Sequence, residues 1–214
     1  MLNLIKNLLT DIFLHKFVKP ILSFIIKKIF IVNINGKENI PEKDSAIIVS
    51  NHVSYVDAIL ISLMIDRDIR FITWYKFFEL PILGWFLRLH KDISIYPQRD
   101  KVEEAFNEAQ QVIDNKELLG IFPEGSLSPD GTIQEFRHGV IDIWSMNKDV
   151  PVIPVGLSNL WDTPFSNKYS LKEKRDHLFK RRSITINIGK PILYSDCSDT
   201  VCLEKTVKEL SEIL

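Results

Sequence analysis

Short runs rich in β-branched residues alternate with longer helical patterns along most of this 214-residue chain. Strands and helices that alternate in this way are typical of an α/β protein whose sheet is covered by helices. The predicted strands are residues 30–36, 45–50, 70–74, 92–97, 118–123, 150–156 and 183–191, and the predicted helices are residues 58–65, 77–90, 102–115, 139–147 and 201–213. We therefore predict one α/β domain over residues 32–214, with a central mixed, mostly parallel sheet flanked by helices.

Composition and charge bear on which classes of function to expect. A net charge of −1 gives no electrostatic reason to expect nucleic-acid binding, which needs a basic surface. The two cysteines, Cys197 and Cys202, have no histidine nearby at ligand spacing, so we predict no metal site. A pair this close could only close a small loop, and so few cysteines suit a reducing compartment, which favours the cytoplasm.

The first 31 residues differ from the rest of the chain, since they carry five lysines and one acidic residue, Asp11. Apolar residues at helical spacing predict two helices broken near Pro20, because proline interrupts a helix but is accepted in its first turn. Charged residues interrupt the apolar stretches too often for a membrane span or a signal peptide. The segment either packs on the body with its lysines in water, or is an amphipathic anchor that lies on an anionic membrane surface. We favour the anchor.

The sequence NHVSYVD, residues 51–57, lies between a predicted strand and a predicted helix. One interpretation is a helix start, with Ser54 as N-cap and Asp57 favoured by the helix dipole. That interpretation does not explain His52, which it places outside the helix at the mouth of the turn. The other interpretation is catalytic: a histidine whose ring is held by a carboxylate is a positioned general base.

Other polar groups follow later strands. In FPEGSLSPDG, residues 122–131, an acid, a glycine and two serines could cradle a hydroxylated or phosphorylated ligand, or could form an ordinary turn. Arg99 is expected to end a strand, and Arg137 precedes His138 and Gly139. Each could be an ordinary surface residue, but together with Lys76 they offer cations for an anionic ligand.

The order of these motifs resembles that of the glycerolipid acyltransferases, the 1-acyl-sn-glycerol-3-phosphate acyltransferase family. NHVSYVD looks like the family's NHxxxxD motif, and it is followed in step by Lys76 before ELPILGW, Arg99 in IYPQRD, FPEGSLS, FRHGV and VPVIPVG. The resemblance covers roughly residues 35–192. One departure concerns the family's E-G-T-R-S motif: Ser126, Leu127 and Ser128 follow Gly125 here, so the arginine is missing.

The resemblance implies an O-acyltransferase in which His52 is the general base and Asp57 steadies the imidazolium, without a covalent acyl-enzyme and without a cofactor. The donor would be acyl-CoA or acyl carrier protein, and the acceptor 1-acyl-glycerol-3-phosphate, giving phosphatidic acid. Alternatives are reacylation of a lysophospholipid such as lysophosphatidylethanolamine, a thioester-independent transacylase, or a non-enzymatic lipid-binding scaffold. The enzyme would work on the cytoplasmic face of a membrane, held there by residues 1–31. The residues expected to bind substrate are Lys76, Arg99, Glu124, Gly125, Ser126 and Arg137.

Overall fold

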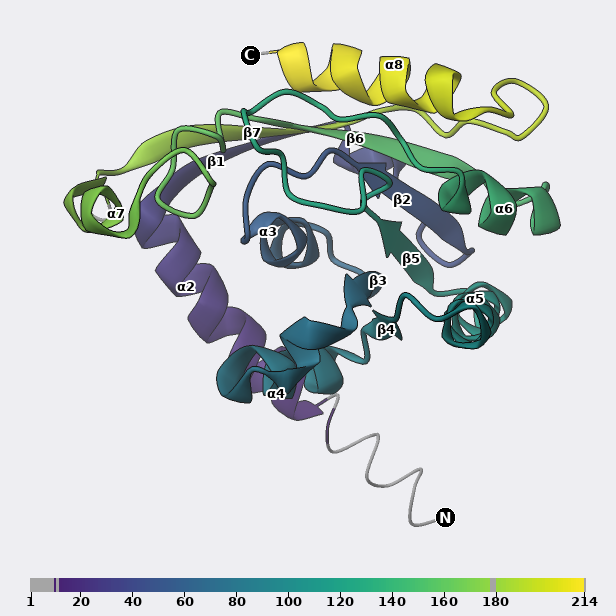
Figure 1. The fold of residues 1–214 in the computed structure, drawn as a ribbon, viewed down its shortest axis with the longest axis horizontal. Helices are drawn as coiled ribbons and strands as arrows, with labels where there is room; N and C mark the ends of the chain where they lie inside the picture. The colour runs from purple at the N-terminus through teal and green to yellow at the C-terminus, as the bar shows by residue number, and fades with distance from the viewer. Residues whose placement is uncertain (1–9, 11, 178–179, 214) are drawn as a thin grey trace.

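The chain folds around a seven-stranded sheet (Figure 1) in a computed structural model that describes residues 10, 12–177 and 180–213. The strand order is β1-β7-β6-β2-β5-β3-β4, and neighbouring strands are parallel except for β6 and β7. This confirms the predicted mixed, mostly parallel sheet. The strands are β1 (Phe30–Asn35), β2 (Ala46–Ser50), β3 (Ile69–Trp74), β4 (Ile93–Ile95), β5 (Leu118–Ile121), β6 (Val152–Ser158) and β7 (Arg182–Ile188).

Helices cover both faces of the sheet, as Figure 1 shows. One apolar core forms between the sheet and α5, α6 and α8, and the other between the sheet and α2 and α3. The helices are α2 (Lys19–Ile29), α3 (Asp57–Met64), α4 (Pro81–His90), α5 (Arg99–Asp114), α6 (Gly139–Met146), α7 (Leu171–His177) and α8 (Thr200–Glu212).

The central strand β2 explains why its sequence is an unbroken apolar run. Side chains alternate between the two faces of a strand, and here both faces are covered. Ile47 and Val49 belong to the core under α5, α6 and α8, while Ala46 and Ile48 belong to the core under α2 and α3. All four side chains are completely buried, and β2 is a central strand of the sheet, between β6 and β5.

The backbone stays helical through Pro20, where the sequence predicted a break between two helices. A π-helical turn, Leu14–Val18, leads directly into α2, and the amide of Lys19 donates to the carbonyl of Leu14. Pro20 is the second residue of α2, which directly follows the π turn, and the helix passes through it. The helix therefore continues where we expected it to stop; residues 1–9, which the first predicted helix includes, lie outside the described residues.

The remaining differences are local. A 3₁₀ turn, Tyr75–Glu79, precedes α4, so the helix predicted from residue 77 begins at Pro81. A second 3₁₀ turn, Lys37–Asn39, follows β1, and α7 was not among the predicted helices. Cys197 and Cys202 form a disulfide that closes a small loop before α8. Because disulfides belong to oxidising environments, the cysteines do not support the expected reducing compartment.

Within the residues described, none of the helices combines the length and the apolar content that crossing a bilayer requires. The boundary expected between residues 31 and 32 falls inside β1. Leu14 and Ile26 are buried, so the helical segment of residues 12–29, here called the N-terminal helix, is packed on the body along one side.

Candidate active site

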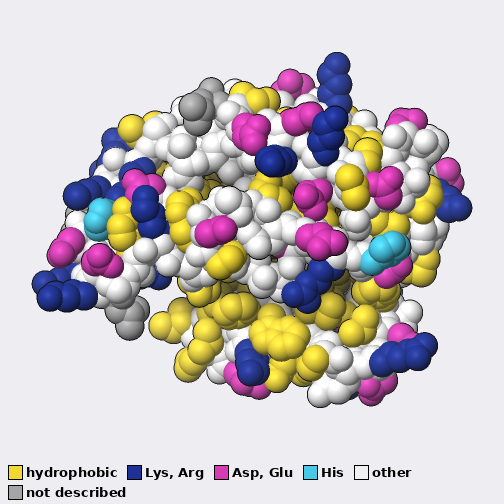
Figure 2. Space-filling view, turned by 45° about the horizontal axis from the view of Figure 1, so that its top comes forward, with side chains coloured by type: hydrophobic (Ala, Val, Ile, Leu, Met, Phe, Trp, Pro, Cys, Tyr) yellow, Lys and Arg dark blue, Asp and Glu magenta, His cyan; other side chains and the backbone are white. Residues whose placement is uncertain are grey.

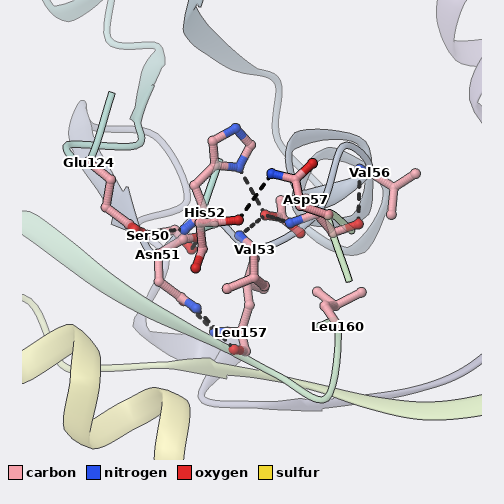
Figure 3. A network of polar contacts seen from close by, with 12 residues as sticks. Ser50, Asn51, His52, Val53, Val56, Asp57, Glu124, Leu157 and Leu160 are labelled. Carbon is pink, nitrogen blue, oxygen red and sulfur yellow. Dashed lines mark hydrogen bonds and ion pairs between the residues drawn. The ribbon is translucent and has the colours of Figure 1, made fainter. Parts of the chain in front are cut away.

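The turn after β2 brings His52 and Asp57 together (Figure 3). His52 Nδ1 lies 2.9 Å from Asp57 Oδ2, and the same oxygen accepts the backbone amides of Val53 and Ser54, each at 2.8 Å. An ionised Asp57 accepts from Nδ1–H, which leaves Nε2 of the ring with its lone pair available. The carboxylate thus holds both the turn and the tautomer of the histidine.

The expected helix cap is wrong in one respect. The residue before α3 is Val56 and makes no side-chain cap bond, while Asp57 is the first residue of the helix. Ser54 lies within the turn, and its hydroxyl accepts the amide of Val56 at 3.4 Å. The turn is closed by the carboxylate of Asp57 reaching back to the preceding amides, so this residue serves the histidine and the turn at once.

Asp57 is completely buried, and this burial raises its pKa, although the contacts with His52 and the amides of Ser54 and Val53 oppose the rise. Its second oxygen, Oδ1, has no hydrogen-bond partner among the described residues. Burying a carboxylate costs a large desolvation free energy unless hydrogen bonds or an opposite charge offset it. The hydrogen bonds described above all reach Oδ2, the oxygen that faces His52, so the negative charge is best stabilised where an imidazolium would form.

The side chain of Glu124, which follows the neighbouring strand β5, holds the backbone of His52. Strand β5 pairs with β2 in parallel, so both motifs leave the same edge of the sheet. Glu124 Oε1 accepts the backbone amide of His52 at 2.6 Å, and Oε2 accepts the amide of Gln134 at 2.9 Å. The residue is buried, and desolvation raises the pKa of Glu124 to about 7 although both amides lower it. Glu124, expected to bind substrate, therefore has both oxygens engaged in holding the turn.

The imidazole of His52 is held on its face as well as at its edge. It stacks on Phe122, with ring centroids 4.3 Å apart, and Phe122 stacks in turn on Phe71 at 5.4 Å. The His52 carbonyl accepts the amide of Ser128 at 2.8 Å. The side chain is still 24% exposed, so a reactant can reach the ring that these contacts orient.

Asn51 is a residue that the sequence reasoning missed. Its side chain bonds both backbone groups of Leu157 in β6, donating to the carbonyl at 3.1 Å and accepting the amide at 2.8 Å (Figure 3). Asn51 is buried and directly precedes His52. It fixes the end of β2 against β6, on the side opposite to Glu124. Its place beside the histidine in the motif was the signal that could have found it.

A pocket of about 700 Å³ is lined by the segment that follows β5, and His52 and Asp57 are not among the described residues that line it. Its lining includes Glu124, Ser126, Leu127 and Arg137. Gly125, between them, has φ +66°, and a Cβ there would lie 2.8 Å from Arg137 Nε. Glycine is therefore required both for the left-handed turn and for the close approach of the guanidinium. The structure brings Gly125, Ser126 and Arg137 together, while their expected part in substrate binding stays a prediction.

Two predicted residues are placed elsewhere. Arg99 does not end a strand: β4 stops at Ile95, and Arg99 is the first residue of α5. Its side chain is 95% exposed, with Nε 3.7 Å from Glu103 Oε1. Lys76 is exposed on the 3₁₀ turn after β3. Neither is among the described residues that line the pocket beside Glu124, so in this conformation the cation at the pocket is Arg137.

Together the fold and the site define an α/β domain with a carboxylate-held histidine at the carboxyl ends of parallel strands. A family model described as Acyltransferase matches residues 31–158, more than half of the chain. The chain belongs to this acyltransferase family, which confirms the predicted resemblance at that level.

Two relatives agree with this placement, and one solved structure shares the fold. The chain is 25% identical over 198 residues to the chloroplastic 1-acyl-sn-glycerol-3-phosphate acyltransferase LPAT1 of Arabidopsis thaliana, covering 92% of this chain and 53% of the relative. It is 30% identical over 175 residues to a 1-acyl-sn-glycerol-3-phosphate acyltransferase of Chlamydomonas reinhardtii, covering 80% and 49%. The chain thus spans about half the length of these relatives.

The solved structure is that of the acyltransferase PlsC from Thermotoga maritima. It superimposes with a TM-score of 0.71 at 24% identity, covering 92% of this chain and 76% of that one. This likeness confirms the predicted fold.

Proposed function

We propose that this chain transfers a fatty acyl group from a thioester donor, acyl-CoA or acyl carrier protein, to the free hydroxyl of 1-acyl-sn-glycerol 3-phosphate. The observation that carries the proposal is the pair formed by His52 and Asp57, which leaves the lone pair of Nε2 available. Glu124, which accepts the backbone amide of His52, lines a pocket together with Arg137. The relatives named for this reaction support the choice of substrate. The site requires no metal or cofactor for the steps described below.

In the proposed reaction, His52 Nε2 takes the proton of the hydroxyl as its oxygen attacks the thioester carbonyl. The buried carboxylate of Asp57 stabilises the imidazolium. When the carbon–sulfur bond breaks, the imidazolium returns the proton to the leaving thiolate, so the ester and the free thiol are the products. Such general-base help typically contributes a factor of about 10² to 10⁴ in rate.

Arg137 is the residue we assign to the acceptor's phosphate, because a guanidinium binds phosphate oxygens through a planar pair of donors. Ser126, which is exposed, would contribute its hydroxyl to the same headgroup. Glu124 and Gly125 would shape this side of the pocket, and Lys76 and Arg99 would need to approach it on substrate binding. The N-terminal helix would contact the membrane surface, on the cytoplasmic face of the membrane.

A second function is favoured by Leu127, which occupies the motif position of an arginine and lines the pocket. An apolar side chain there removes one cation from the headgroup region. This favours an acceptor whose phosphate carries a further group, such as lysophosphatidylethanolamine. A transacylase would use the same residues with a phospholipid donor, and a lipid-binding scaffold would need no catalytic histidine.

The test is a panel of lysolipids combined with each thioester donor, scored for acylated product. We expect wild-type protein to acylate lysophosphatidate and His52→Ala to lose at least about 10² of the turnover while keeping its melting temperature. His177→Ala, on α7, changes a histidine to which no part of the mechanism is assigned, so it is the matched control and should retain activity. Substantial turnover by His52→Ala would refute the mechanism. Preference for lysophosphatidylethanolamine would select the second function, and product formed without any thioester would indicate a transacylase.

A further inference from the structure

Helix α4 presents an apolar side to the solvent. Ile82 is 84% exposed, Trp85 is 49% exposed, and Leu80, just before the helix, is 48% exposed. The opposite side of the helix packs inward, since Gly84, Leu87 and His90 are buried. A Cβ at Gly84 would lie 2.1 Å from the carbonyl of Phe78, so this side of the helix is in close contact with the 3₁₀ turn. The orientation of α4 is therefore fixed, and its outer side chains remain in water.

The outer side of α4 continues that of the N-terminal helix. The rings of Phe13 and Trp85 meet edge to face, with centroids 6.3 Å apart. Large apolar side chains recur every three to four residues along the N-terminal helix and are also exposed: Phe13, Phe17, Ile21 and Phe24. In Figure 2 apolar side chains gather over the lower part of the molecule, where α4 lies in Figure 1. We call these side chains, with Leu80, Ile82 and Trp85, the apolar face.

The charged side chains within the two segments that carry the apolar face are positive, although exposed Glu79 directly precedes Leu80. Residues 12–29 and 80–91 contain no aspartate or glutamate, but they contain Lys16, Lys27, Lys28 and Arg88, all exposed. Lys28 Nζ lies 5.4 Å from the centre of the Phe24 ring. A second copy of the chain docked through this face would bring like charges together, which is unfavourable. An anionic lipid surface accepts both the apolar side chains and the cations.

We infer that α4 is part of the membrane-docking surface, so that the chain meets an anionic leaflet through two elements distant in sequence, the N-terminal helix and α4. Ile82 enters the acyl boundary, Trp85 lies at the headgroup level where aromatic residues are enriched, and Arg88 faces the anionic groups. The inference deepens the proposed function by naming how this chain reaches a lipid substrate. It can be tested without measuring acyl transfer, so it can fail independently.

The experiment is co-sedimentation of the full chain with vesicles of equal parts phosphatidylglycerol and phosphatidylcholine. The variant Ile82→Ala/Trp85→Ala should lower the partition coefficient on the order of tenfold or more, because two large apolar side chains no longer leave water. The matched control is Met146→Ala/Val201→Ala, which truncates two residues that are 58% and 74% exposed on α6 and α8. This control should partition as the wild type does.

Because Trp85 is half buried, Ile82→Ala alone serves as a second variant whose fold is not at risk, and it should lower the partition coefficient severalfold. Trp85→Phe should also remove most of the fluorescence quenching that bromine-labelled acyl chains cause. Partition equal to that of the control pair overturns the inference. So does a wild-type dimer that the double variant converts to monomer with vesicle binding unchanged, since the face would then be a subunit interface.

Discussion

Asp57 shows how one buried side chain can join local structure to chemistry. Its Oδ2 accepts three N–H groups, from His52 Nδ1 and from the amides of Val53 and Ser54. The first contact orients the ring, while the other two fold the turn that carries it. The negative charge of Asp57 and the hydrogen bonds that its oxygen accepts therefore have effects that a substitution can separate.

Asp57→Asn should separate those effects. The amide oxygen can take the place of Oδ2 and accept the same donors, so the free energy of unfolding should change little. The neutral side chain cannot stabilise an imidazolium, so we expect kcat to fall by about 10² or more. The measurement is steady-state turnover beside chemical denaturation. Retained turnover, or a loss of activity only in proportion to unfolded protein, would contradict this assignment.

Glu124 should make stability depend on pH. Burial raises its pKa from 4.5 to about 7, so between these values the folded chain keeps a proton that the unfolded chain releases. Stability should therefore fall as pH rises from about 4.5 to about 7 and level off above that range.

The measurement is the melting temperature across that range. We expect the wild type to lose about 5 °C or more relative to Glu124→Gln, which does not titrate. Glu135→Gln, an exposed neighbour, is the control and should follow the wild-type curve. Parallel curves for wild type and Glu124→Gln would show that the carboxyl group has an ordinary pKa.

At the scale of elements, the site depends on three adjacent strands. His52 follows β2, while β5 supplies Glu124 on one side and β6 supplies the backbone groups of Leu157 on the other. Each neighbour contacts the end of β2 through a side chain bonded to main-chain atoms. The position of the histidine is thus set by the register of the sheet.

Asn51→Ala should destabilise the junction of β2 and β6. It removes the amide nitrogen and oxygen of the Asn51 side chain. The backbone carbonyl and amide of Leu157, which bond to these two atoms, would be left buried without a partner. We expect a loss of about 2–5 kcal/mol in the free energy of unfolding. Asn33→Ala, which removes an exposed bond to Ser183 on the outer strands, should cost less than about 0.5 kcal/mol. Similar losses for both variants in urea titrations would exclude a special role for Asn51.

At the scale of the whole molecule, the N-terminal helix packs on the body with one side and exposes an apolar side to solvent, so packing does not exclude the predicted anchor. Leu14 and Ile26 are buried against the body, and Lys19 and His15 contact Asp68. The other side exposes Phe17 and the further residues of the apolar face. A helix packed in this way holds its outer side in a fixed relation to α4, so that the two can meet one surface together.

Most of the fold and the central pair of the site could be predicted from the sequence, because both depend on short-range pattern. Alternation of strand and helix runs located each of the described strands, and a separation of five positions across one turn was enough to place Asp57 beside His52. The exact ends of elements were harder, as at Arg99, since helix starts depend on contacts that pattern alone does not show. The helix through Pro20 was missed because the π turn that admits it has no marker in the sequence.

Sequence by itself determined the α/β class and the pairing of His52 with Asp57, since side-chain periodicity and local hydrogen bonds depend on residues close together in the chain. Only the tertiary structure decided that Glu124 holds the backbone of His52, that Arg137 lies over Gly125, and that α4 continues the exposed side of the N-terminal helix. These relations join residues far apart in sequence. They follow from strand order and helix packing, which the whole chain sets cooperatively.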